Sequence, residues 1–264
     1  YMYELINMRQ EDIKVNFAIL SEQQKGMYFN TMEEEFQNMY AYGNIRKDDN
    51  PGITITLYDN ILLLKGLLLQ STAAMREAIL SSNDQQLIEQ YDQWINLKTE
   101  IADAYAKGLE TDKLEKEANE LEGALVKKSS AFNQFQTANK VSWKDIQEKL
   151  EPTDAAIEFI RFPENLGDPF SPYVYAALIV TSYTKQPQMV NLCSEADLEK
   201  ILGKVRSNNI QFVNEVYGTK DNQEQELSKL IWDPLQGPLE GIQKLYFAPD
   251  GLLHKVAFSA IKVG

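Results

Sequence analysis

The side chains best suited to chemistry are one cysteine and one histidine. Cys193 and His254 are the single cysteine and histidine of the 264-residue chain. A cysteine nucleophile needs an imidazole within hydrogen-bonding reach, because the base generates the thiolate. Cys193 precedes a predicted helix, whose N-terminal dipole could lower the thiol pKa. A cysteine that ends a short strand is more often inert packing, so we predict that Cys193 and His254 form no catalytic dyad.

The acidic clusters do not have the pattern of a metal site. Glu33-Glu34-Glu35 is typical of a solvated helix face, and residues 48–52 (DDNPG) lack the spaced ligands and terminal glutamate of a calcium loop. Neither a GxGxxG nor a GxxxxGK motif occurs. A hydrolase that uses paired carboxylates has no supporting spacing. We therefore predict no catalytic, cofactor-binding or metal-binding residues.

Charge and composition narrow the choice of partners and compartment. The formal net charge is −13, and a strongly acidic surface repels phosphate backbones, so we expect no nucleic-acid partner. Lys65 interrupts the longest apolar stretch, residues 61–69, and no membrane-spanning segment is predicted. The first ten residues lack the pattern of a signal peptide. A single cysteine fits a reducing compartment, although it equally fits a secreted protein without disulfides, and we predict a cytoplasmic location.

Residues 1–141 have the pattern of successive helices. Apolar residues at spacings of three and four predict an amphipathic helix from Leu20 to about Gly43, marked by Met27, Tyr28, Met32, Phe36, Met39 and Tyr40. A loop at 46–52 precedes an apolar helix over 53–80. Ser82-Asn83-Asp84 can cap a helix that reaches Tyr105, and residues 111–135 suit a helical hairpin or short coiled coil. No fixed 34-residue repeat is present, yet the atypical end of a tetratricopeptide-like array stays possible.

Strands begin after residue 141. Ser142 can cap a short helix over 143–150. Predicted strands cover 155–162, which alternates like a half-buried strand, 174–182, which is apolar like a central strand, 188–192, which forms a hairpin with 174–182, and 244–248. Ser194 can cap a helix over 195–206, and another runs from about 221 to Asp233-Pro234. The sequence thus predicts an antiparallel helical array at 1–141 followed by a mixed-sheet α/β region at 142–264.

The order of motifs in the second half resembles a known family. Trp143 to Leu150, the run YVYAALIVT, the segment LIWDPL and the run KLYFAPDGLLHKVAFSAI are similar to the N-terminal half of the CHAT domain, a caspase-like domain attached to tetratricopeptide arrays. Ala257 stands where that family usually has proline. Upstream, NILLLKGLLL at 60–69 resembles the helix that commonly precedes CHAT domains. The resemblance implies a caspase-like partial domain.

The CHAT family implies a caspase- or separase-like cysteine peptidase, with its histidine and cysteine in "HG" and "C" motifs on later strands. Neither motif occurs in this chain, and the position of His254 is not that of the family's catalytic histidine. We therefore expect a non-catalytic portion, whose helices bind or sense a protein partner and whose α/β half supports a downstream His–Cys core.

The alternative is a stand-alone protein-interaction adaptor with a degenerate CHAT-like module. Five tyrosines could line a partner groove, although packing between helices explains them equally well: Tyr1, Tyr3, Tyr40, Tyr42 and Tyr58.

Overall fold

The chain forms two compact units. The computed structural model describes residues 4, 8–10, 12, 13, 16, 20–128, 141–203 and 226–261, with the backbone alone for 67–74. The helical unit comprises Tyr1–Glu34 and Leu63–Lys140, and the sheet unit comprises Glu35–Leu62 and Val141–Gly264. A helical region followed by a mixed α/β region is confirmed as the fold class. The boundary predicted at 141/142 follows the order along the chain, whereas in space residues 35–62 group with the strands.

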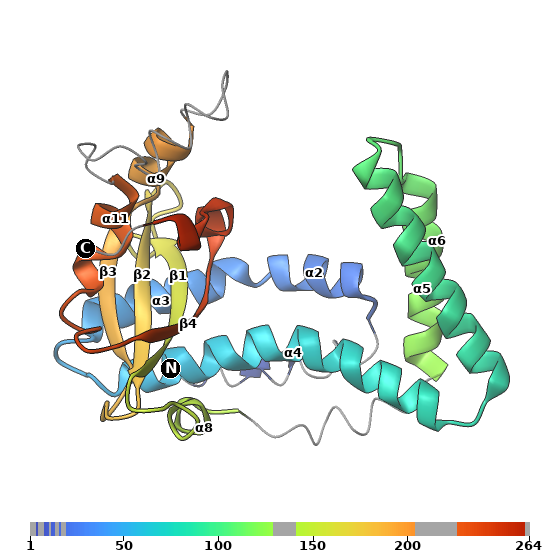
Figure 1. Cartoon of the computed structure of the whole chain (residues 1–264), viewed down its shortest axis with the longest axis horizontal. Coiled ribbons are helices and arrows are strands. Elements are labelled where there is room, and N and C mark those ends of the chain that lie inside the picture. The colour runs from blue at the N-terminus through green and yellow to red at the C-terminus, as the bar shows by residue number, and fades with distance from the viewer. Residues whose placement is uncertain are drawn as a thin grey trace. The chain divides into compact units, whose positions relative to one another are not determined.

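The helical unit is built around an apolar core between helices. It contains α2 (Glu22–Asn30), the later part of α4 (Ile53–Ser81), α5 (Gln85–Ala106) and α6 (Asp112–Lys128). Asp84 caps α5 as predicted, because its side chain accepts a hydrogen bond from the Leu87 N–H. Helices α5 and α6 lie side by side (Figure 1), which confirms the helical hairpin. The buried core residues are Met75, Ile79, Leu87, Tyr91, Trp94, Ala118, Leu125 and Val126. The rest of the predicted 111–135 helix, beyond Lys128, lies outside the described residues.

The prediction of one continuous helix from Leu20 to Gly43 is wrong, because the helix is interrupted. The structure has two helices there, α2 and α3 (Glu33–Arg46). Thr31 separates them, since its hydroxyl donates to the Tyr28 carbonyl at 2.6 Å and competes with the helical backbone for that acceptor. Met27, placed on the predicted apolar stripe, is 57% exposed. The stripe is therefore buried only from Met32 onward.

A four-stranded mixed sheet forms the centre of the sheet unit (Figure 1). Its strands are β1 (Asp154–Pro163), β2 (Tyr173–Thr181), β3 (Gln188–Ser194) and β4 (Lys244–Ala248), in the order β3-β2-β1-β4. β2 pairs antiparallel with both β1 and β3, which confirms the predicted hairpin, and β4 pairs parallel with β1. The parallel pair is brought together by a long crossover rather than a hairpin.

Helices cover both faces of the sheet. On one face, α9 (Glu195–Leu202), α11 (Glu226–Ile231) and the 3-10 helices η1 (Asp233–Leu235), η2 (Gly251–Lys255) and η3 (Phe258–Ala260) pack on an apolar cluster that includes Ile157, Phe159 and Ile179. Ser194 caps α9 as predicted. The opposite face lies against α3 and the start of α4 (Figure 1).

Burial on both faces corrects one sequence-based expectation. β1 was predicted to be a half-buried strand, yet only Glu158 and Arg161 among its residues are half-buried and the other eight are buried. Both faces of β1 are therefore covered, and the alternation of apolar and polar residues in its sequence does not mark a solvated face.

The short helix α8 (Trp143–Gln147) joins the sheet unit through a cap and a side-chain contact. The Ser142 hydroxyl accepts from the Asp145 N–H, as a helix N-cap does, which confirms the predicted cap. The Trp143 N–H donates to Asp59 Oδ1 of α4 at 2.6 Å. These bonds fix α8 beside the start of the sheet.

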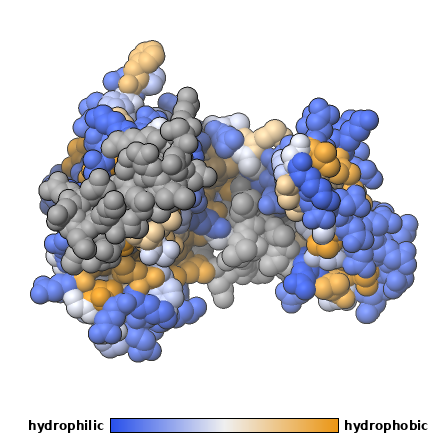
Figure 2. Space-filling view, turned by 45° about the horizontal axis from the view of Figure 1, so that its top comes forward, coloured by the Kyte–Doolittle hydropathy of each residue, from blue (hydrophilic) through white to orange (hydrophobic). Residues whose placement is uncertain are grey.

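The coloured residues on the face shown in Figure 2 are mostly hydrophilic, with scattered hydrophobic patches. Within the described part of the chain, every helix is too short or too polar to cross a bilayer.

Candidate functional site

The structure places Cys193 and His254 in different environments. Cys193 lies near the end of β3, half-buried, and packs against the apolar cluster of the sheet unit. His254 lies in η2 and is exposed. Both residues are described, and no hydrogen bond joins them. The geometry of a thiol activated by an imidazole is therefore not built here.

The thiol of Cys193 is electrostatically unsuited to nucleophilic attack. Burial raises the pKa of the Cys193 thiol to about 12, and the nearby carboxylate of Asp197 contributes to the same shift. Because the thiolate is the reactive form, a thiol with this pKa is a weak nucleophile at neutral pH.

A polar cluster fastens the turn before η2 to the sheet. Arg161 of β1 donates to both carboxylate oxygens of Glu195, through Nη2 at 2.9 Å and through Nε. The Tyr175 hydroxyl donates to Glu195 Oε2 at 3.1 Å and accepts from the Leu252 N–H at 2.9 Å. Asp250 accepts from the Arg161 backbone N–H at 2.9 Å. The cluster therefore connects β1, β2, α9 and η2.

Within this cluster the Arg161 guanidinium pairs with the Glu195 carboxylate, whereas the Asp250 carboxylate accepts from backbone N–H groups. The hydrogen bond from Arg161 holds the pKa of Glu195 below its usual range, although burial opposes this shift. Burial raises the pKa of Tyr175, whose side chain is 1% exposed. A carboxylate held by arginine on both oxygens is a poor proton acceptor, so the arrangement positions the turn rather than performing acid–base chemistry.

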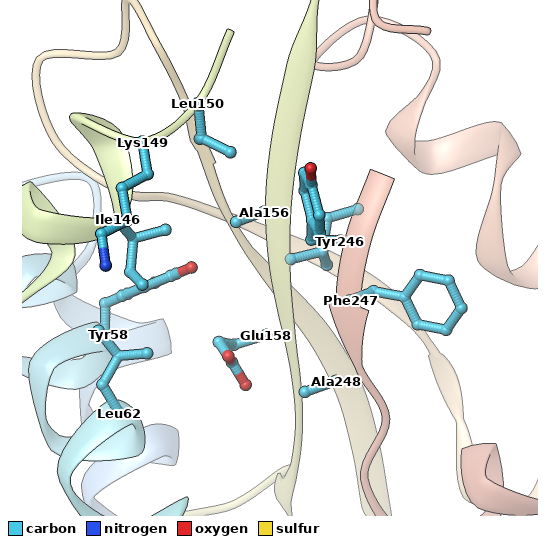
Figure 3. Close-up of a pocket in the computed structure, with 11 residues that line it drawn as sticks. Tyr58, Leu62, Ile146, Lys149, Leu150, Ala156, Glu158, Tyr246, Phe247 and Ala248 are labelled. Carbon is cyan, nitrogen blue, oxygen red and sulfur yellow. The ribbon is translucent and has the colours of Figure 1, made fainter. Parts of the chain in front are cut away.

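An apolar pocket lies between α4, α8 and the β1–β4 pair (Figure 3). Its volume is about 420 Å³. Tyr58 and Leu62 come from α4, and Ile146 from α8, while Tyr246 comes from β4. Figure 3 shows the Glu158 carboxylate among these apolar side chains. Pockets that are mostly apolar with a few polar groups are the usual form of binding sites.

Beside this pocket, β4 is the edge strand of the sheet that the described residues form, and we call this the open edge. The Lys244 N–H donates to the Thr153 carbonyl at 3.2 Å, and Lys244 pairs with Asp154. Alternate residues of a strand direct their backbone groups to the same neighbour, so the N–H and C=O of Leu245 and Phe247 point away from β1. Among the described residues, none bonds to these outward groups.

The side chains of β4 are also incompletely covered. Tyr246 is 47% exposed and Phe247 is 40% exposed. Figure 3 shows Tyr246 and Phe247 on opposite sides of the strand, with Tyr246 toward the pocket. The Phe247 ring packs near the rings of Phe159 and Phe258. The Lys244 ammonium lies 4.6 Å from the centre of the Tyr246 ring. Unpaired backbone and exposed aromatic rings on one edge are features of a strand that another strand can join.

The remaining sequence candidates have simple local roles. Glu33 and Glu34 are exposed on α3, as the solvated-face interpretation predicts, whereas Glu35 is half-buried. Arg46 donates to Asp49 Oδ1 at 2.9 Å in the loop after α3. Among the described residues, no group of three or more histidine, cysteine, aspartate or glutamate side chains could hold a metal ion.

The tyrosines proposed for a partner groove divide into three groups. Tyr40 is buried, at 8% exposure, and packs within the sheet unit. Tyr58 is 1% exposed but borders the pocket, and Tyr42 is half-buried. Tyr1 and Tyr3 lie outside the described residues.

Sequence reasoning missed both the pocket and the open edge. The predicted strand at 244–248 was correct, but its neighbour in the sheet depends on contacts with β1, about ninety positions earlier in the chain. The run KLYFA contained a signal for an edge strand. It begins with lysine, a residue common on sheet edges, and its two adjacent aromatic residues point to opposite faces of the strand.

Comparison with protein-family models, with curated proteins and with solved structures finds no match for this chain.

Proposed function

We propose that this chain is the non-catalytic portion of a CHAT-family cysteine peptidase, in which the sheet unit supports a His–Cys core supplied by further sequence and the helical unit binds a protein partner. The resemblance of residues 143–261 to the CHAT domain motivates the family. The open β4 edge is the observation that carries the supporting role. An additional strand on that edge would satisfy the backbone of Leu245 and Phe247 and cover Tyr246.

The state of the two candidate catalytic residues supports a non-catalytic role for this chain. A half-buried thiol with a pKa of about 12 and an exposed imidazole that does not bond to it lack the features of an activated pair. The purified chain should not cleave a diverse fluorogenic peptide library. Cleavage that the Cys193→Ala substitution abolishes would contradict the proposal.

Two experiments test the supporting role: sequencing the gene beyond Gly264, and measuring whether the encoded segment binds this chain. We expect the codons beyond Gly264 to encode a His-Gly motif and a later cysteine. That downstream segment, expressed separately, should form a complex with this chain in size-exclusion chromatography. A stop codon at that point would instead favour the stand-alone adaptor.

The β4 edge can be blocked selectively. Phe247→Pro removes an outward N–H and keeps the N–H groups that face β1, a placement at which sheet edges tolerate proline. We expect it to weaken the complex at least tenfold, as loss of a strand-pairing bond with added crowding should. Phe247→Ala, the matched control, keeps the N–H and should weaken it less. Equal binding by Phe247→Pro and the parent chain, with unchanged near-UV circular dichroism, would rule out pairing at this edge.

A further inference from the structure

Helix α2 makes an unusual contribution to the helical unit. Among its nine residues, all of them described, Lys25 alone is buried, at 3% exposure. Met27 is 57% exposed. The apolar core of α4, α5 and α6 includes no residue of α2. Tyr28 and Phe29 of α2 are half-buried, but neither belongs to this core, so the contacts of α2 with α6 are of another kind.

The described hydrogen bonds between α2 and α6 lie at the N-terminus of α2, while near its other end the Tyr28 hydroxyl accepts from Asn16 Nδ2 at 2.9 Å. The backbone N–H of Glu22 donates to Glu122 Oε1 of α6 at 2.7 Å. The Ser21 hydroxyl donates to Asn119 Oδ1 at 3.1 Å, and the Asn119 amide donates to Gln23 Oε1. Ser21 also closes a capping box with Gln24, so its bond to α6 depends on an intact helix start.

Charge reinforces the same contact. Glu122 is 4% exposed, and its carboxylate sits at the positive end of the α2 dipole. Burial raises the pKa of Glu122, while the bond from Glu22 and the charges of Lys25 and Lys98 oppose that shift. Lys98 of α5 bonds Glu22 at 3.1 Å on the exposed side. Loss of the Glu122 carboxylate would leave the buried ammonium of Lys25 without its largest favourable charge.

The α5–α6 hairpin has a different basis for its stability. Its core residues Leu87, Trp94 and Leu125 are between 0% and 5% exposed and pack on one another and on α4. None of them requires α2. The polar contacts can therefore open at lower cost than the apolar core, as expected for a locally unfolding segment.

We propose that α2 is a detachable helix, held on α6 by a polar clasp formed by Ser21, Glu22, Lys25, Asn119 and Glu122, and that it leaves α6 while the α5–α6 hairpin stays folded. Detachment would expose Ser21 and Glu22 on α2, and Asn119 and Glu122 on α6. The two α6 side chains would then form a surface that can accept the N-terminus of a helix. This gives the helical unit two states that a protein partner can distinguish.

Amide hydrogen exchange on the whole chain, read by mass spectrometry, tests the clasp. In the parent chain, α2 amides should exchange faster than those of α5 and α6. Glu122→Ala should accelerate α2 exchange about tenfold or more, since it removes a hydrogen bond to a charged group and leaves a buried charge. Exchange in α5 and α6 should change less than twofold. Glu117→Ala removes an exposed carboxylate from the same helix and should leave α2 exchange unchanged.

A second variant guards against misfolding of the first. Asn119→Ala removes the clasp bond to Ser21 and the neighbouring bond to Gln23 without leaving a buried charge, and should accelerate α2 exchange several-fold. The proposal is overturned if α2 exchange is unchanged in both variants. It is equally overturned if α2, α5 and α6 accelerate by the same factor, because α2 would then open only when the whole unit unfolds.

Discussion

At the residue scale, Gly251 shows how one position can combine a backbone and a packing requirement. Its φ of +52° lies in the left-handed region, and a Cβ built on it would lie 2.4 Å from Tyr175 Oη and 2.8 Å from Arg161 Cδ. Both neighbours belong to the cluster that fastens η2 to the sheet. A larger residue would therefore disturb the turn and the cluster together.

We predict that Gly251→Ala destabilises the sheet unit more than Gly241→Ala does. Gly241 also has a positive φ, +78°, but a Cβ there meets nothing within 4 Å. Both substitutions incur the left-handed backbone cost of about 1–2 kcal/mol. Gly251→Ala should lose roughly another 1–3 kcal/mol through overpacking. Urea unfolding followed by tryptophan fluorescence in a Trp94→Phe background measures the difference, and equal losses would show that the cluster accommodates the added methyl group without strain.

At the element scale, helix starts could be predicted from the sequence because their signals are local. Asp84, Ser142 and Ser194 each accept a hydrogen bond from a backbone N–H three residues later, as their positions predicted. The strands were also recognised from apolar runs within a single segment. Short-range chemistry of this kind is visible without knowledge of the rest of the fold.

Features that depend on distant partners could not be predicted in the same way. The apolar stripe crosses Thr31 without a change in period, so the break between α2 and α3 was hidden. The parallel pairing of β1 with β4 and the pocket beside it depend on segments far apart in sequence. The Arg161–Glu195 pair was missed for the same reason, since 34 positions separate its members. The absence of catalytic, cofactor and metal residues stays a prediction.

Close contact between α3 and α4 leads to a prediction at this scale. A Cβ on Gly43 of α3 would lie 2.4 Å from Cδ1 of Leu57, a fully buried residue of α4. Gly43→Ala should gain about 1 kcal/mol in helix propensity but lose more through overpacking, a net loss of roughly 1 kcal/mol. Gly123→Ala in α6, where a Cβ meets nothing within 4 Å, should instead stabilise its unit by about 0.5–1 kcal/mol. The denaturant midpoints of both variants measure these changes in stability. If both substitutions raised the stability, Leu57 would have to repack around the new methyl group without cost.

At the scale of the whole molecule, each unit has an apolar core of its own. One core lies among α4, α5 and α6, and another lies between the sheet and α9, α11 and the 3-10 helices. The sequence indicated the change from helices to strands near residue 141, but not that α3 and the start of α4 belong with the strands. That grouping requires contacts such as Gly43 with Leu57 and Trp143 with Asp59, whose partners the local pattern does not identify.

Separate cores predict separable unfolding. The three tryptophans are convenient probes, because Trp94 is buried in the helical unit while Trp143 and Trp232 are buried in the sheet unit. In a Trp94→Phe background the fluorescence reports the sheet unit, and in a Trp143→Phe/Trp232→Phe background it reports the helical unit. Leu125→Ala should destabilise the helical transition by about 2–5 kcal/mol, since Leu125 is fully buried, and leave the other transition in place. Ile157→Ala, in the core of the sheet unit, should have the reverse effect. If either substitution moved both transitions equally, the two cores would unfold as one cooperative body, because a cavity in one core can lower the stability of the other only when the two unfold together.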